Sequence, residues 1–198
     1  MAFGYPVMLD LAGVRVLVVG GGTIAGRKTA GLLAAGAIVT VVAPVVLPEL
    51  AAAAADVRER PYEVADLDGQ QLVLTATDDP IVNARVASDA RANGVWVNSA
   101  DDPQNCTFIL PAVARQGSVV VAVGTDGSSP ALARHLRDRI ADLVLTPEVA
   151  VAAEELARQR AELHAAGIRS ESIDWTERLR AALAPRGDDA GPQTETVS

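Results

Sequence analysis

The sequence is poor in cysteine and histidine, and it carries no excess of positive charge. A single cysteine among 198 residues, Cys106, excludes an internal disulfide and a zinc site built from cysteines. The two histidines, His135 and His164, argue against a histidine-built metal site, so we predict no bound metal. The net charge of −8 at pH 7 argues against nonspecific binding to nucleic acid or anionic lipid, because both require a basic face.

Long hydrophobic runs are also absent. No stretch of about 18 apolar residues occurs, and the first residues show no basic region followed by an apolar one. We therefore expect a cytoplasmic protein with no membrane segment and no nucleic-acid partner. Hydrophobic residues still make up 49% of the chain, enough for the core of one ordinary domain with a smaller appendage.

What the sequence does contain is a glycine triplet between a strand pattern and a helix pattern. The apolar run that ends at Val19 is typical of a buried parallel strand, and a helix is expected over 24–35. Gly20, Gly22 and Ala25 fill the three small positions of the G-x-G-x-x-G/A pattern of dinucleotide-binding proteins. In that pattern the second glycine lets the backbone approach a pyrophosphate, which the helix N-terminus then binds.

The chain before residue 103 alternates between strand and helix patterns. This alternation predicts an α/β fold with a Rossmann-type, doubly wound parallel sheet. Ligands of such sheets lie beyond the carboxyl ends of the strands, so the loops that follow the strands should gather at one rim. Either Thr77 or Asp78 is expected to cap the third helix. We predict strands over 15–19, 38–42, 57–62, 71–75 and 95–97, and helices over 24–35, 47–55 and 81–93.

The end of the second strand departs from the usual dinucleotide-binding pattern. An acidic residue normally holds the adenosine ribose here, whereas this chain reads Val42-Ala43-Pro44-Val45, with Glu49 as the nearest acid. Backbone groups must hold the ribose, or the glycine turn is only a structural turn of some other α/β protein. The glycine pattern alone leaves both interpretations open.

After residue 103 the pattern changes. A polar, glycine-rich turn over 124–130 precedes a helix, with Ser128 or Ser129 as its cap. We predict strands over 107–110 and 118–124, and helices over 131–145, 147–166 and 172–183. We expect a Rossmann domain over 1–102, a small α+β dimerisation segment over 103–145, a helical C-terminal region over 146–184 and a disordered tail over 185–198.

Four separated motifs together resemble one known family. They are Gly20–Lys28, Ala76-Thr-Asp-Asp79, Asn98-Ser-Ala-Asp-Asp-Pro103 with Phe108-Ile-Leu-Pro111, and Gly127-Ser-Ser-Pro-Ala-Leu-Ala-Arg134. Over about residues 5–145 the chain resembles the precorrin-2 dehydrogenases, which also form the N-terminal part of sirohaem synthase. The resemblance implies a stand-alone, NAD-dependent enzyme that oxidises precorrin-2 to sirohydrochlorin in sirohaem or cobalamin synthesis. It also accounts for the missing ribose acid, since the family commonly reads Val-x-Ala-Pro there.

The resemblance implies a homodimer formed largely through the middle segment, and it assigns the chemistry to Asp101. A carboxylate beside the nicotinamide can accept the proton that leaves with the hydride. Judged from the residues alone, Asp101 or Asp102 instead forms an Asx turn before Pro103, and we treat Asp102 as structural. The residues expected to bind NAD are Gly20, Gly22, Thr23, Ile24, Ala25, Pro44, Val45, Thr77 and Asp78.

The substrate carries many carboxylates although the protein is acidic, so the attraction must be local. Arginines and the N–H groups of the glycine-rich turn are the expected partners, and ordinary solvated charge is the alternative for the arginines. The expected substrate-binding residues are Asn98, Arg115, Thr125, Gly127, Ser128, Arg134 and Arg137.

Two other functions stay open at this point. The protein is alternatively a chelatase that inserts iron or cobalt into sirohydrochlorin, alone or besides the dehydrogenation. It is alternatively a non-catalytic module that senses NAD and regulates a partner. For the remaining residues of interest, we expect Cys106 to be a small buried residue and His135 to lie at the surface.

Overall fold

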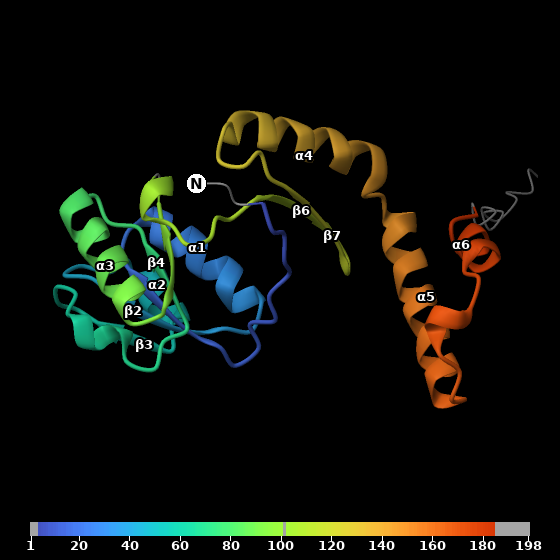
Figure 1. Cartoon of the computed structure of the whole chain (residues 1–198), viewed down its shortest axis with the longest axis horizontal. Helices are drawn as coiled ribbons and strands as arrows, with labels where there is room; N and C mark the ends of the chain where they lie inside the picture. The colour runs from blue at the N-terminus through green and yellow to red at the C-terminus, as the bar shows by residue number, and fades with distance from the viewer. Residues whose placement is uncertain (1–3, 101, 185–198) are drawn as a thin grey trace, which may run out of the picture. The chain divides into compact units, whose positions relative to one another are not determined.

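The computed structural model describes residues 4–100 and 102–184. The chain divides into two compact units, Met1–Leu110 and Pro111–Ser198, which carry the element labels of Figure 1. The tail predicted to be disordered, 185–198, lies outside the described residues. The predicted division into four segments stays a prediction.

The first unit is built on a five-stranded sheet in the order β3-β2-β1-β4-β5, in which neighbouring strands pair in parallel. In β1 and β2, Val19 lies opposite Val42, so the two strands end in line at the same edge. Their near-continuous apolar runs are those of strands covered on both faces. The strands are β1 (Arg15–Val19), β2 (Ile38–Val42), β3 (Asp56–Arg58), β4 (Leu72–Thr75) and β5 (Trp96–Ser99).

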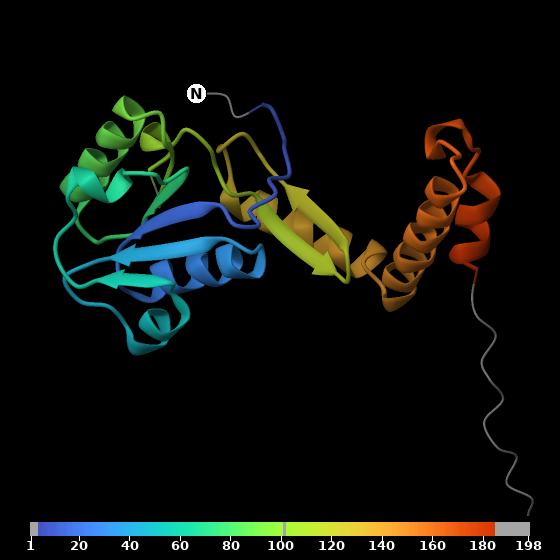
Figure 2. The same ribbon diagram turned by 90° about the horizontal axis from the view of Figure 1, so that it is seen from below.

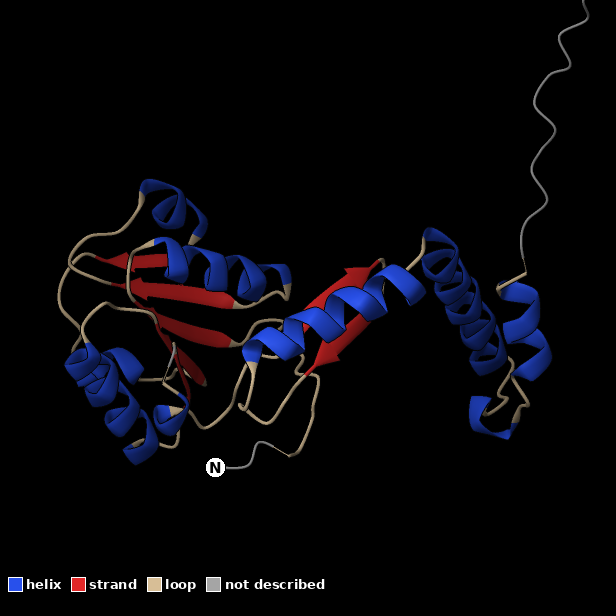
Figure 3. Cartoon of the chain, turned by 90° about the horizontal axis from the view of Figure 1, so that it is seen from above, coloured by secondary structure: helices blue, strands red, loops and turns tan. Residues whose placement is uncertain are grey.

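Helices cover both faces of this sheet. The helices α1 (Thr23–Ala34) and α2 (Pro48–Ala53) lie on one face and α3 (Pro80–Ala92) on the other (Figure 3). Alternate residues of β1 serve the two cores: Val16 and Val18 belong to the core with α1 and α2, and Leu17 and Val19 to the core with α3. The predicted Rossmann-type fold is therefore confirmed.

The second unit combines a β-hairpin with helices. Strands β6 (Ala112–Gln116) and β7 (Val119–Val123) pair antiparallel. Helix α4 (Pro130–Val144) packs on the hairpin, and α5 (Pro147–Ala165) packs beside α6 (Thr176–Ala182), as Figure 2 shows. In the described part of the chain, no helix is long and apolar enough to cross a membrane.

Two of the predicted strands are wrong in their position. The stretch 107–110 is no strand; the first strand of the hairpin is Ala112–Gln116. Thr107 and Phe108 instead donate their N–H groups to the carbonyl of Val97, at 2.8 and 3.4 Å. The strand predicted over 57–62 ends at Arg58, because the chain beyond it turns to place Arg60 against Asp66.

Candidate functional site

The carboxyl ends of the central strands meet in one rim, as predicted. The Gly20 N–H donates to the carbonyl of Val42 at 3.0 Å, and the Ala76 N–H donates to that of Val19 at 2.8 Å. The Leu47 N–H donates to the carbonyl of Gly21 at 2.9 Å. The glycine triplet is thus hydrogen-bonded to the end of β2 and to the loop that follows it, and the loop after β4 is hydrogen-bonded to the end of β1.

The three glycines of the triplet differ in what surrounds them. A Cβ atom at Gly20, whose φ is +131°, would lie 2.4 Å from the carbonyl oxygen of Ala76, and one at Gly21 would lie 1.9 Å from that of Val45. At Gly22 nothing lies within 4 Å of the Cβ position. Gly20 and Gly21 therefore let the loops close, whereas Gly22 leaves free space. Gly21 was not predicted as a site residue, although the sequence has three consecutive glycines where the pattern requires only two.

The helix that follows provides the features that a pyrophosphate needs. Gly22 is the N-cap of α1 without a side-chain hydrogen bond, and the first turn of α1 carries no acidic residue. The free space at Gly22 and the N–H groups of this turn fit a dinucleotide phosphate. Ala25 is fully buried and packs in the core with α1 and α2, as the pattern requires of its third small position.

Apolar side chains flank this helix terminus. Ile24 is 41% exposed and Val45 is 80% exposed, and Pro44 beside it is exposed as well. Exposed apolar groups at the rim of a ligand site commonly cover the planar rings of a bound cofactor. The predicted cofactor residues of the first two loops thus share one open surface.

Substitutions in the glycine triplet should separate folding from cofactor binding. Gly21→Ala forces the new methyl group into the carbonyl of Val45, so it should destabilise the protein by about 1–3 kcal/mol. Gly22→Ala meets nothing in the protein, so it should leave the melting temperature unchanged but weaken NAD binding at least about tenfold, because it fills the phosphate space. Calorimetry with NAD and thermal unfolding measure the two effects. Equal NAD affinity in Gly22→Ala would place the phosphate elsewhere.

The loop after β4 is held by its own side chains. The Thr77 hydroxyl donates to Asn83 Oδ1 at 2.8 Å, and Asn83 Nδ2 donates back to the carbonyl of Thr77 at 2.9 Å. The prediction that Thr77 or Asp78 caps the helix is wrong: Asp79 Oδ1 accepts the N–H of Ile81 at 2.8 Å. Asp79 is the N-cap residue because it directly precedes Pro80, the first residue of α3. The side chain of Asp78 is exposed at the rim.

The end of β5 is the second part of the candidate site. Asn98 is buried, and its amide bonds Lys28 Nζ at 2.9 Å and the carbonyl of Phe108 at 3.1 Å. Lys28 is the functional candidate that the sequence analysis missed, because the two residues lie 70 positions apart. Asp101, the predicted catalytic residue, lies outside the described residues. Cys106 is 2% exposed, as predicted for a small buried residue.

In the second unit the predicted glycine-rich turn is closed by its own hydroxyl groups. The Ser129 N–H donates to Thr125 Oγ1 at 3.1 Å, and Ser128 Oγ donates to the carbonyl of Thr125 at 2.5 Å. Gly127 has a φ of +78°, which a turn of this kind requires. Ser129 caps α4 by accepting the N–H of Leu132 at 3.2 Å, which confirms one of the two predicted caps.

The predicted arginines of this unit differ in their surroundings. Arg115 on β6 and Arg134 on α4 are exposed. Arg137 is partly buried; its Nε pairs with Asp138 at 2.7 Å, and its Nη1 donates to the carbonyl of Val113 at 3.4 Å. Arg137 therefore stabilises the contact between α4 and the hairpin, whereas the other two present their charge to solvent. His135 is exposed, as predicted.

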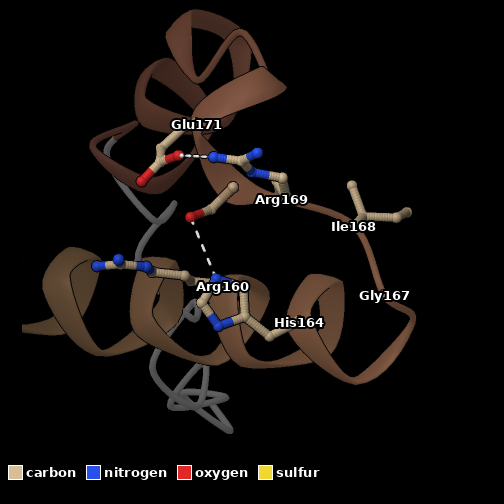
Figure 4. A pocket seen from close by; sticks show the side chains of 7 residues that line it. Arg160, His164, Gly167, Ile168, Arg169 and Glu171 are labelled. Carbon is tan, nitrogen blue, oxygen red and sulfur yellow. Dashed lines mark hydrogen bonds and ion pairs between the residues drawn. The ribbon is translucent and has the colours of Figure 1, made fainter.

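A pocket of about 440 Å³ lies between α5 and the turn that follows it (Figure 4). His164 Nε2 lies 3.2 Å from Ser170 Oγ, and Arg169 pairs with Glu171 at 3.1 Å. None of the predicted site residues lines this pocket. Among residues 4–100 and 102–184, no three histidine, cysteine, aspartate or glutamate side chains cluster in a way that would hold a metal ion.

The parallel sheet, the glycine turn and the open helix N-terminus define an NAD(P)-binding Rossmann domain. The chain belongs to the family described as "Putative NAD(P)-binding", whose model matches residues 7–112. The predicted NAD cofactor is thereby confirmed at the level of NAD(P).

Relatives of known name agree with this family. The chain is 47% identical over 142 residues to the siroheme synthase of Azotobacter vinelandii. This alignment covers 68% of this chain and 30% of that protein. It is 38% identical over 188 residues to that of Nitrosococcus oceani, covering 91% of this chain and 40% of that protein. The chain thus spans about a third of the length of these relatives.

A solved structure is similar over nearly the whole chain. It is that of SirC, a precorrin-2 dehydrogenase, with 29% sequence identity and a TM-score of 0.72. The similarity covers 90% of this chain and 96% of that chain. Together with the siroheme synthases, it confirms the resemblance to the precorrin-2 dehydrogenases that the four sequence motifs indicated.

Proposed function

We propose that this chain catalyses the NAD-dependent oxidation of precorrin-2 to sirohydrochlorin. The similarity to SirC, which extends through both units, is the observation that carries the proposal. The free space at Gly22 and the unobstructed N-terminus of α1 support it, because they fit the pyrophosphate of a dinucleotide. The cytoplasmic location expected from the sequence stays a prediction.

The reaction removes a hydride and a proton from the macrocycle. NAD supplies the hydride acceptor, and the protein must supply a base for the proton. We assign that base to Asp101, which follows the carboxyl end of β5 in the sequence. Strand ends of this kind lie on the ligand side of a Rossmann sheet, where a carboxylate is well placed for general base catalysis.

We assign the binding of the substrate's carboxylates to the second unit. Arg115 and Arg134 are exposed there, and α4 begins at an N-terminus that carries no acidic residue in its first turn. Arginine forms bidentate hydrogen bonds with carboxylates, so a few such residues are enough in a protein of net negative charge. Thr125, Gly127 and Ser128 shape the turn and present its backbone to the same ligand.

We further propose that the chain forms a homodimer through the hairpin and α4. No residue of β6 or β7 is fully buried, although β7 consists of four valines and one alanine. Leu132 and Leu136 of α4 are 48% and 39% exposed. Burying these apolar groups against a second copy is favourable, and a two-fold interface is the commonest solution. The mass of the protein in solution tests this assignment.

Incubation of the purified chain with precorrin-2 and NAD is the experiment that tests the proposed activity. We expect NADH to form, measured at 340 nm, with sirohydrochlorin as the product. The same assay with NADP measures the cofactor preference. No turnover at micromolar enzyme would refute the proposal.

Two additional arms distinguish the alternative functions. Insertion of iron or cobalt into sirohydrochlorin without NAD would identify a chelatase, an activity to which the similarity with siroheme synthases draws attention. Binding of NAD without binding of the tetrapyrrole, measured by spectral titration, would identify a sensor module.

A further inference from the structure

Lys28 lies between the cofactor-binding helix and the last strand of the sheet. It is the only lysine among the 17 basic residues of the chain. It is partly buried on α1, and its Nζ donates to Asn98 Oδ1 on β5 at 2.9 Å. Withdrawing an ammonium group from water costs free energy, which a solvent-exposed surface position would avoid. The partly buried position of Lys28 therefore indicates that its ammonium group does more than keep the protein soluble.

Asn98 also bonds the part of the chain that follows β5. Its side chain is buried, and Nδ2 donates to the carbonyl of Phe108 at 3.1 Å and lies 3.7 Å from Cys106 Sγ. Both ends of the amide thus have partners within the protein. Asn98 thus connects α1 to the chain beyond β5, and its role in substrate binding stays a prediction.

Cys106 fastens the backbone at the end of β5. Its Sγ accepts the N–H of Ser99 at 3.1 Å and lies 3.3 Å from the carbonyl oxygens of both Ser99 and Asp102, to one of which the S–H donates. Burial raises the pKa of this thiol, so it stays neutral and keeps its proton for these bonds. The Ala100 N–H donates to the carbonyl of Thr75 at 3.0 Å. The backbone at Ser99 and Ala100 is thus held by hydrogen bonds.

We propose that Lys28 and Asn98 are positioning residues of the dehydrogenase. They hold the carboxyl end of β5, with Cys106, against the helix whose N-terminus binds the cofactor. The hydride acceptor is assigned to α1, and Asp101, the proposed base, follows β5 in the sequence. This inference rests on the proposed function, and a small misplacement of such groups is costly, about 100-fold for 1 Å.

Replacing Lys28 with methionine tests the proposal, because methionine keeps an unbranched apolar stem and removes the ammonium group. We expect kcat to fall about 10- to 100-fold while the Kd for NAD changes less than about twofold. Because Cys106 is the single cysteine, its reaction with a thiol reagent such as DTNB reports on the same segment without any activity. We expect this reaction to become at least about tenfold faster in Lys28→Met. The variant loses the hydrogen bond between Lys28 and Asn98, so the end of β5 should open more often and expose Cys106.

Matched variants separate positioning from general loss of structure. Arg27→Met removes an exposed charge one residue away and should change neither kcat nor the thiol rate. Lys28→Gln keeps an N–H donor for Asn98 and should recover most of kcat. The double variant Lys28→Met/Asn98→Ala should be no slower than the slower single variant, because both substitutions remove the same hydrogen bond between α1 and β5.

The outcomes distinguish this proposal from the proposed function. If the parent protein turns over but Lys28→Met behaves like Arg27→Met in both measurements, the positioning role is wrong. If the parent protein shows no turnover, the proposed function is wrong, and an unchanged thiol rate in Lys28→Met would also remove the structural part of this inference.

Discussion

Asp101→Asn is expected to lower kcat for precorrin-2 oxidation by about 100- to 10,000-fold, the usual contribution of a positioned general base. The amide has nearly the same size as the carboxylate but cannot accept the proton that leaves the macrocycle. NAD binding is proposed at the glycine triplet and α1, so its Kd should stay within about twofold of the parent value. Stopped-flow measurement of NADH formation and calorimetry with NAD provide the two numbers.

The neighbouring carboxylate is a matched control. Asp102 Oδ2 accepts a hydrogen bond from Asn105 Nδ2 at 2.6 Å, so its side chain is engaged within the short helical turn over Pro103–Asn105. Asp102→Asn should therefore leave kcat nearly unchanged and cost only a little stability. Similar rates for Asp101→Asn and the parent protein would return Asp101 to the role of a turn residue. A large loss in Asp102→Asn alone would move the base by one position.

The central strands β1 and β2 were predictable because their sequences fit only a buried strand that ends at a sharp turn. The predicted β1 and β2 agree with the structure residue by residue. Both are short, near-continuous apolar runs, and Gly20 and Ala43-Pro44 end them. Burial on two faces and a sharp turn at the end are local properties, so the sequence specifies them directly.

The edge strand and the stretch before the hairpin were not predictable in this way. The polar alternation over 57–62 resembles an edge strand, but β3 stops at Arg58, where two arginines converge on Asp66. The apolar stretch after Cys106 resembles a strand as well, yet its first residues bind the carbonyl of Val97. Both outcomes depend on partners that lie many residues away, which periodicity cannot identify.

The same division applies to the site. The roles of Gly20 and Ala25 follow from backbone geometry and helix packing, and both could be read from their spacing. The contact of Lys28 with Asn98 joins α1 to β5, and only the order of strands in the sheet brings these elements together. The sequence thus identifies the residues that shape the backbone more readily than those that connect distant elements.

Asp66→Ala should be the most destabilising substitution among the charged residues of the first unit. The side chain of Asp66 is 0% exposed, and it accepts hydrogen bonds from Arg58, from Arg60 and from the backbone N–H of Glu63 at 2.6–2.9 Å. Removing one partner of a buried ion pair costs about 3 kcal/mol, because the remaining charges stay partly desolvated. For a chain of this size that is a decrease in melting temperature of about 6–12 °C, measurable by calorimetry.

The acid sensitivity of the protein should depend on the same carboxylate. Burial alone would raise the pKa of Asp66, but the hydrogen bonds from Arg60, the Glu63 amide and Arg58 outweigh it and lower the pKa to about 2. Because the folded pKa lies below that of the unfolded chain, the unfolded state binds the proton first. The carboxylate therefore contributes about 2 kcal/mol above pH 4, and this contribution is lost as the pH falls towards 2.

Asp56→Ala is the control for both effects, since Asp56 pairs with the same Arg58 at 3.0 Å but its side chain is 51% exposed. An exposed pair contributes at most about 1 kcal/mol, so this variant should unfold near the parent temperature. Its stability should also keep the parent's steep decrease between pH 4 and 2, whereas Asp66→Ala should show a shallower one. If both variants lose the same stability with the same dependence on pH, the buried ion pair does not fix the loop after β3, and the contacts of Leu67 with the core must hold it instead.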